Sequence, residues 1–123
     1  MFSFGKKLHV YDAAGVEVAY IEQKIFTFLP RYCVYRNGSI AFEVVKEFSF
    51  FHPRYTIPQL GMEVHGDFWD HEYGIYSNGQ CVSSVSKEWF TLGDAYAVRI
   101  ADGADAVSLL AIVLVIDACI EAQ

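Results

Sequence analysis

A long apolar stretch near the end of the chain restricts the fold more than any other feature. Residues 105–120 read DAVSLLAIVLVIDACI and contain neither Gly nor Pro, a length and composition that predict an α-helix. Its only interior polar residues are Ser108 and Asp117. Since successive helical residues turn by about 100°, these two point to opposite sides and leave no polar stripe. Such a helix must be covered all round.

A bilayer or a β-barrel can provide that cover. A membrane span needs ~20 apolar residues, whereas a run of about 10–14 is typical of a buried core helix. Asp117 at the bilayer centre would cost a further ~2.5–3.5 kcal/mol. A helix of about 24 Å also suits barrel strands of roughly five to seven residues. We therefore expect a central helix over residues 104–121 inside an antiparallel barrel or half-barrel. The side chains expected to be almost fully buried are Val107, Leu110, Val113, Leu114 and Ile116.

The preceding part of the chain, residues 1–101, repeats a short unit. Segments 24–35, 46–57 and 87–98 each begin with Lys followed by an aromatic-rich stretch, and weaker copies lie between them. A period near 20 residues holds two short strands with their turns but is too short for a βαβ unit. The repeat therefore predicts roughly ten antiparallel strands in a meander.

Turn residues support the meander. Asn37-Gly38 and Asn78-Gly79 are pairs typical of tight hairpins, because both positions require positive φ. Pro30, Pro53 and Pro58 are expected between strands, where a missing N–H does least harm.

Composition excludes several classes of protein. With 54% hydrophobic and 20% charged residues, the chain is not intrinsically disordered. A net charge of −6 argues against nucleic-acid binding and against broad adhesion to anionic membranes. Cys33, Cys81 and Cys119 form no C-x-x-C pair and are expected to be buried, reduced thiols. We expect one domain over residues 1–123, with a cytoplasmic location and no transmembrane segment.

Several short motifs carry a family likeness. They are KKLHVYD (6–12), AYIEQK (19–24), VKEF (45–48), GDFWDHEY (66–73), SKEWF (86–90) and the closing helix. With these residues the chain resembles bacterial members of the LURP-one-related family, within the Tubby C-terminal-like and phospholipid-scramblase-like superfamily. The resemblance implies a twelve-stranded barrel around a central hydrophobic helix.

The resemblance also implies a missing start. Family members of this kind begin with further hairpins, so two or three strands are expected to be absent. Either the barrel closes with fewer strands, or an edge stays open near Leu8 to Tyr11. We expect the 2–11 edge to be covered by another copy of the chain or by the chain's own terminus.

The resemblance suggests lipid recognition, because Tubby-like relatives bind phosphoinositides and scramblase-like relatives act on membranes. It brings no catalytic motif. In this chain, cations recur at equivalent positions of the repeat, which tend to share one end of a barrel. The candidate headgroup-binding residues are Lys24, Arg31, Lys46, Arg54 and Lys87. Such binding should be headgroup-specific and weaken with salt. The alternative is a set of rim charges paired with nearby Glu22, Glu47 and Glu88.

A polar cluster over residues 63–72 suggests a second chemistry. Glu63, His65 and Asp67 would share one face of a strand, and two His with carboxylates are competent metal ligands. The candidate metal ligands are His65, Asp67 and His71; a turn with solvated charges explains the same residues.

The aromatic residues of the repeat could form a stacking platform for single-stranded nucleic acid, but a barrel that wraps a helix needs bulky residues as well. We expect these aromatics in the core: Phe26, Phe28, Phe48, Phe50, Trp89 and Phe90.

These observations favour a non-enzymatic binding or scaffold module without a cofactor, acting on a lipid headgroup or a protein partner. The competing hypothesis is a metal-binding protein or an enzyme that uses the His65–Glu72 cluster.

Overall fold

The computed structural model describes residues 5–48, 52–86 and 97–121. Its elements are β1 (Lys7–Tyr11), β2 (Glu17–Gln23), β3 (Arg31–Arg36), β4 (Ser39–Glu47), β5 (Arg54–Ile57), the 3₁₀ turn η1 (Pro58–Leu60), β6 (Met62–Asp67), β7 (Glu72–Ser77), β8 (Gln80–Ser86), β9 (Ala97–Ile100) and α1 (Ala106–Glu121).

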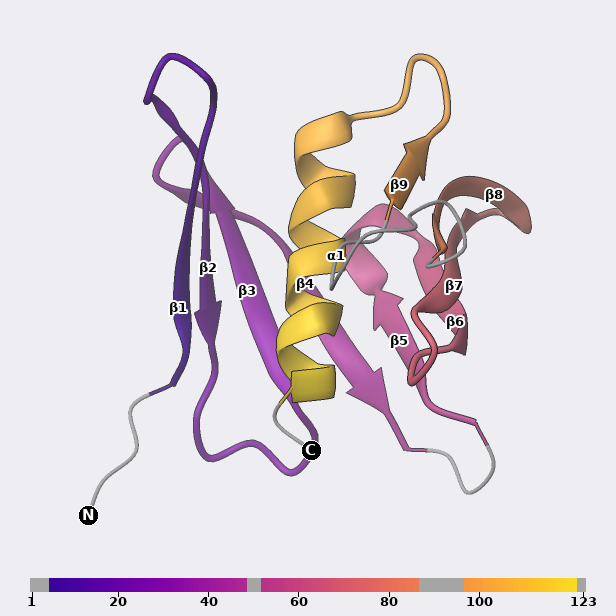
Figure 1. Cartoon of the computed structure of the whole chain (residues 1–123). Coiled ribbons are helices and arrows are strands. Elements are labelled where there is room, and N and C mark those ends of the chain that lie inside the picture. The colour runs from indigo at the N-terminus through magenta and orange to yellow at the C-terminus, as the bar shows by residue number, and fades with distance from the viewer. Residues whose placement is uncertain (1–4, 49–51, 87–96, 122–123) are drawn as a thin grey trace.

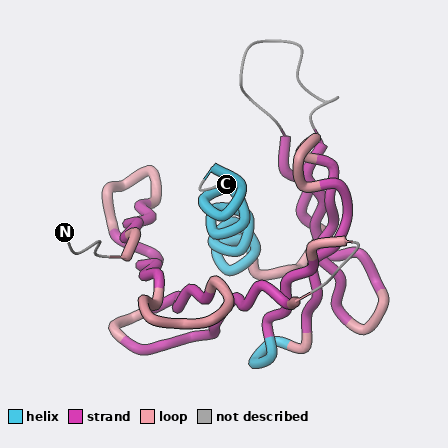
Figure 2. Tube along the Cα trace, turned by 90° about the horizontal axis from the view of Figure 1, so that it is seen from below, coloured by secondary structure: helices cyan, strands magenta, loops and turns pink. Residues whose placement is uncertain are grey.

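The strands form one antiparallel sheet in strict chain order, from β1 to β9. Figure 1 shows α1 lying against this sheet, and the view in Figure 2 shows the described strands curving around three sides of the helix. The expected mainly β meander around a hydrophobic C-terminal helix is therefore confirmed.

Of the two expected forms, the described sheet corresponds to the half-barrel, and its strand number is slightly lower than expected. The described residues form nine strands rather than about ten, and the sheet is not closed, because β1 pairs only with β2 and β9 only with β8. Of the two outcomes expected near Leu8 to Tyr11, the structure shows the open edge within the described residues. Its coverage by a second copy or by the chain's terminus stays a prediction.

Local turn chemistry sets the hairpins as expected. Asn37 and Gly38 have φ of 54° and 78°, and Asn78 and Gly79 have φ of 52° and 77°. Two consecutive positive values define the type I′ geometry that matches the twist of paired strands. Pro30 and Pro53 directly precede β3 and β5.

The core lies between the concave face of the sheet and α1. Ile21, Val34 and Ile75 from the strands and Ile112 and Ile116 from the helix are each 0% exposed. In β2, side chains alternate between this core and the convex outer face, whereas β3 and β7 each bury three consecutive residues. The helix is thus buried against the sheet along most of its surface.

One face of α1 departs from the expected complete burial. Leu110 and Leu114 are 39% and 38% exposed, and Val107 is only half-buried, whereas Val113 and Ile116 are buried as expected. Residues four apart share a helix face, and a sheet that does not close leaves that face uncovered. The expectation of almost complete burial was therefore wrong for Val107, Leu110 and Leu114.

The three cysteines differ in burial. All three are free, with Cys33 and Cys119 buried as expected and Cys81 exposed, which corrects the prediction for that residue. Burial raises the pKa of the Cys119 thiol, although hydrogen bonding with Tyr55 and Tyr32 acts in the opposite direction. Neither buried thiol therefore has the lowered pKa of a reactive cysteine.

Over its described residues, the chain holds no helix long and apolar enough to cross a membrane.

Candidate functional site

The meander brings three connections to one end of the sheet. In an antiparallel sheet of sequential strands, alternate connections share an end, so the β2–β3, β4–β5 and β6–β7 connections lie together. This end is at the bottom of Figure 1, where α1 also finishes.

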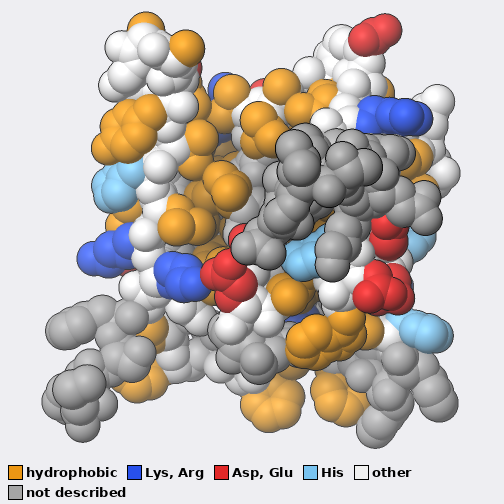
Figure 3. Space-filling model, in the orientation of Figure 1, with side chains coloured by type: hydrophobic (Ala, Val, Ile, Leu, Met, Phe, Trp, Pro, Cys, Tyr) orange, Lys and Arg blue, Asp and Glu red, His pale blue; other side chains and the backbone are white. Residues whose placement is uncertain are grey.

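These connections carry large exposed apolar side chains. Phe26 and Phe28 are each 93% exposed, Phe48 is 62% exposed and Trp69 is 63% exposed. With Ile25, which is 46% exposed, these residues are termed the aromatic rim. Hydrophobic side chains line the lower margin of the molecule in Figure 3. Exposed apolar residues scattered singly are ordinary, and the aromatic rim is a candidate interaction surface because its members share one end of the sheet.

The aromatic rim overturns part of the sequence interpretation. Phe26, Phe28 and Phe48 were expected in the core and are exposed instead, because they lie in the connections, just beyond the paired strands. Phe50, Trp89 and Phe90 lie outside the described residues. The signal for Phe26 and Phe28 was Pro30, which directly precedes β3 and marks residues 24–30 as a loop.

The β2–β3 loop holds its two Phe side chains in a constrained backbone. The Lys24 N–H donates to the Arg31 carbonyl over 2.8 Å, which closes the base of the loop. Phe26 has φ of 62°, a left-handed conformation that is a genuine outlier for a bulky residue. Strained backbone of this kind clusters at functional sites.

Two of the five candidate cations flank this loop. Lys24 is exposed, and the Arg31 Nη1 lies 3.7 Å from the Glu43 Oε2. Both cations act on buried Cys33: burial raises the pKa of its thiol, and the charges of Lys24 and Arg31 partly oppose that rise. The β2–β3 loop is thus an apolar segment with a positive charge at each side of its base.

Of the remaining candidate cations, Lys46 lies beside the base of the loop, because its backbone N–H donates to the Pro30 carbonyl over 3.0 Å, and Arg54 lies one strand further on. Lys46 is half-buried near the end of α1, where its charge acts to lower the pKa of Cys119. Arg54 lies on β5, with its Nη1 3.9 Å from the Glu63 Oε1. Lys87 lies outside the described residues. The four described cations all flank connections at the rim end, but two of them already have carboxylate partners.

The candidate metal ligands do not converge. His65 stacks on Tyr76, with ring centroids 4.3 Å apart, while the Asp67 Oδ1 accepts the Asp70 N–H at the β6–β7 turn. His71 is half-buried in the same turn with φ of 54°. The described part of the chain contains no group of three His, Cys, Asp or Glu side chains arranged to hold a metal. The geometry thus favours the turn interpretation.

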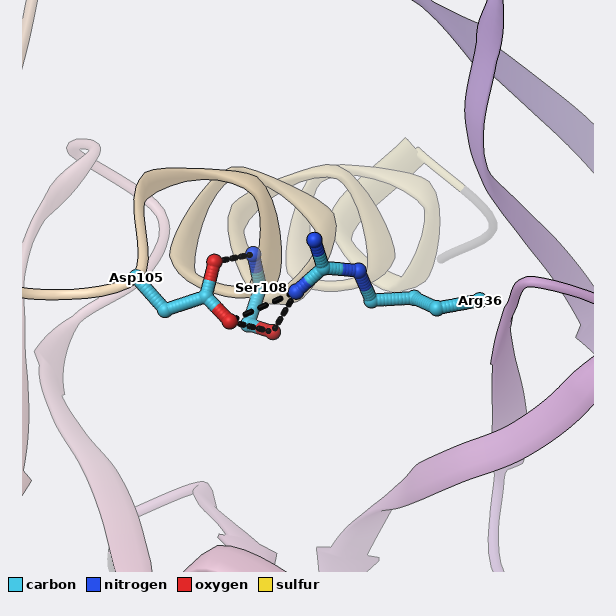
Figure 4. Close-up of polar contacts among 3 residues, drawn as sticks. All are labelled: Arg36, Asp105 and Ser108. Atoms are coloured by element: carbon cyan, nitrogen blue, oxygen red, sulfur yellow. Dashed lines mark hydrogen bonds and ion pairs between the residues drawn. The ribbon is translucent and has the colours of Figure 1, made fainter.

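At the end of the sheet opposite the aromatic rim, hydrogen bonds link β3 to the start of α1. The Arg36 Nη1 donates to the Asp105 Oδ2 over 2.6 Å and to the Ser108 Oγ over 3.2 Å. Asp105 directly precedes the helix and accepts the Ser108 N–H at 3.3 Å, and Figure 4 shows the three residues together. Sequence reasoning missed this cluster, although an Asp three residues before a Ser at a helix start is a capping signal.

The fold first defines the class: a mainly β domain whose single antiparallel sheet wraps a hydrophobic C-terminal helix. Within that class, residues 1–117 match the family model described as LURP-one-related, and the chain belongs to this family. It is 36% identical over 116 residues to the uncharacterized protein YxjI of Bacillus subtilis (strain 168), covering 94% of this chain and 72% of that protein. None of the solved structures compared with the chain matches it.

Proposed function

We propose that this chain is a non-enzymatic binding module that docks onto a phospholipid surface through the aromatic rim. The observation that carries the proposal is the pair Phe26 and Phe28, each 93% exposed on one loop and bracketed by Lys24 and Arg31. Protruding aromatic rings with flanking cations suit the boundary between headgroups and acyl chains, where one part of a side chain is apolar and the other meets water.

The energetics allow reversible docking. Full burial of one Phe side chain contributes about 1.5–3 kcal/mol, so insertion of the β2–β3 loop and Trp69 contributes roughly 4–9 kcal/mol before the cost of immobilisation. A single myristoyl chain, which binds membranes marginally, has an association constant of about 10⁴ M⁻¹. The aromatic rim is therefore strong enough for transient attachment.

Lys24 and Arg31 add a smaller, charge-dependent contribution. Both can reach lipid phosphates when the loop between them is inserted, and cations near an anionic surface contribute about 1 kcal/mol each. Glu43 beside Arg31 and the net charge of −6 limit this contribution. The preference for anionic headgroups is then modest.

Vesicle flotation tests the proposal. The full chain is mixed with phosphatidylcholine vesicles, with and without phosphatidylserine or cardiolipin, and compared with the Phe26→Ser/Phe28→Ser variant. A matched control is Val16→Ser/Ile40→Ser, because these side chains are 59% and 54% exposed near the opposite end of the sheet. Both variants remove the same number of exposed apolar groups.

The expected result is flotation of the wild type and of the Val16→Ser/Ile40→Ser control, with a loss of at least ten-fold in the Phe variant. Equal loss in both double variants would show that general hydrophobicity, rather than the rim, drives flotation. If the wild type floats with none of these vesicles at low salt, the lipid proposal is wrong and a protein partner becomes the leading hypothesis.

A further inference from the structure

A second surface lies on the convex outer face of β1, β2 and β3. His9, Tyr20 and Tyr35 are directly opposite one another on these strands. The His9 and Tyr20 ring centroids are 4.8 Å apart, and those of Tyr20 and Tyr35 are 5.7 Å apart. The result is a continuous row of three rings across the outer face of the sheet.

The row borders a hollow of about 530 Å³. Two carboxylates line it: the Glu17 Oε1 lies 2.6 Å from the His9 Nδ1, and the Glu22 Oε2 accepts the Tyr20 hydroxyl at 3.2 Å. Neither Lys nor Arg occurs among the described residues that line the hollow.

The local electrostatics agree with this composition. The pKa of the Tyr20 hydroxyl is raised, first by partial desolvation and then by the hydrogen bond with Glu22 and the charges of Glu22 and Glu17. The hollow thus combines aromatic faces, which carry negative charge density, with negative carboxylates, and it disfavours anionic ligands.

We propose that this hollow binds an organic cation, such as a quaternary ammonium group, against the Tyr20 and Tyr35 rings. An ammonium over an aromatic face within about 6 Å of its centroid is attracted by the ring quadrupole, and this is the usual means of recognising quaternary ammonium ligands. Glu17 and Glu22 supply the countercharge. The site lies on the sheet face, separate from the aromatic rim, and does not depend on the proposed lipid docking.

Cross-strand aromatic pairs also stabilise sheets by about 0.2–1 kcal/mol each without any ligand. If the row of His9, Tyr20 and Tyr35 rings only stabilises the sheet, a cation and a neutral molecule of the same shape should have the same effect on its NMR shifts. Choline and 3,3-dimethylbutan-1-ol form such a pair, because they have the same branched shape and differ in charge.

The test is a ¹H–¹⁵N NMR titration of the full chain with choline chloride, the neutral alcohol, and sodium chloride at matched ionic strength. Choline is expected to cause saturable shifts of the Tyr20 and Tyr35 amides, whereas the alcohol and sodium chloride cause none. Tyr20→Leu keeps an apolar side chain but removes the ring, and should weaken choline binding roughly two- to five-fold.

If Tyr20→Leu disturbs the sheet, a variant that removes the carboxylate charges still tests the proposal. Glu17→Gln/Glu22→Gln should weaken choline binding by a similar factor, while Glu63→Gln, a carboxylate on the outer face of β6, should leave it unchanged. The proposal is overturned if choline causes no more shift than sodium chloride, or if the neutral alcohol causes the same saturable shifts.

Discussion

At the scale of single residues, Phe26 combines an exposed ring with an unfavourable backbone. A left-handed conformation costs a residue with a Cβ roughly 1–2 kcal/mol, and the 93% exposed Phe26 ring recovers little of that cost by burial. Nothing in the stability of the isolated domain therefore favours Phe at this position. A binding role for the ring would account for it.

Replacing Phe26 with Gly should separate stability from binding. Glycine adopts positive φ without strain, so Phe26→Gly should raise the free energy of unfolding by about 1 kcal/mol, while binding to vesicles falls. Urea denaturation measures the first effect and flotation the second.

Phe28→Gly is the matched control, because Phe28 is equally exposed but is not among the residues with positive φ. This change relieves no strain and increases the freedom of the unfolded chain, so stability should fall by about 0.5–1 kcal/mol. A loss of stability in Phe26→Gly would contradict the strain argument.

Asp105 gives stability a dependence on pH. Burial alone would raise its pKa, but the hydrogen bonds from Ser108 and the charge of Arg36 outweigh burial and hold the pKa of the carboxyl below its usual 3.8. The folded state therefore favours the charged form. The resulting stabilisation is complete above the usual pKa and is lost as the pH falls through the lowered folded pKa.

Arg36→Met should remove part of this stabilisation. Since the Asp105 side chain is 56% exposed, the expected loss is about 0.5–1 kcal/mol at pH 7. Urea denaturation at decreasing pH should show the difference between wild type and variant shrinking as Asp105 becomes protonated. A difference that stays constant down to the acid unfolding limit would mean that Arg36 acts through packing rather than charge.

At the scale of elements, α1 has two unlike surfaces. Ile112 and Ile116 are sealed against the concave sheet, while Leu110 and Leu114 lie on the face that the open sheet leaves partly in solvent. The cost of truncating a side chain should follow this division rather than the uniform hydrophobicity of the helix sequence.

Ile112→Ala should lower the free energy of unfolding by about 2–5 kcal/mol, because it leaves a cavity in a packed core. Leu110→Ala, in the same helix and with a similar loss of volume, should cost about 1 kcal/mol or less, since its side chain is already 39% exposed. Urea denaturation of the two variants provides the comparison. Equal losses would indicate that another part of the molecule or a second copy covers the Leu110 face in solution.

At the scale of the whole molecule, the net charge of −6 opposes an anionic bilayer while the aromatic rim favours any phospholipid surface. Aromatic burial is not screened by salt, whereas interactions of exposed charges decay over a Debye length of about 8 Å at physiological ionic strength. Salt therefore separates the two contributions to docking.

Binding to phosphatidylcholine vesicles should change by less than about two-fold between low and high sodium chloride, because insertion of the rim dominates. The additional binding given by phosphatidylserine or cardiolipin should decline with salt and be absent in Lys24→Ala/Arg31→Ala. Flotation across a salt series measures both. Complete loss of phosphatidylcholine binding at high salt would show that charge, not the aromatic rim, carries the interaction.

Much of the fold could be predicted from local sequence patterns. Asn37-Gly38 predicts its turn because two adjacent positive φ values suit those residues, and the apolar run ending at Ile120 predicts the helix. The candidate site was predicted less well. The cations Lys24 and Arg31 were singled out, but Phe26 and Phe28 were assigned to the core because an aromatic-rich stretch in a loop and one in a strand have similar sequences.

Local sequence signals were enough to predict the element types, their order and the antiparallel meander, because hydrophobic periodicity, turn residues and prolines act within a few residues of one another. Closure of the sheet and the choice of the exposed face of α1 were settled by tertiary packing. Those outcomes depend on contacts between distant segments, such as Arg36 with Asp105, which lie 69 residues apart. Sequence periodicity carries no record of such contacts, since they form only when the whole sheet has curved around the helix.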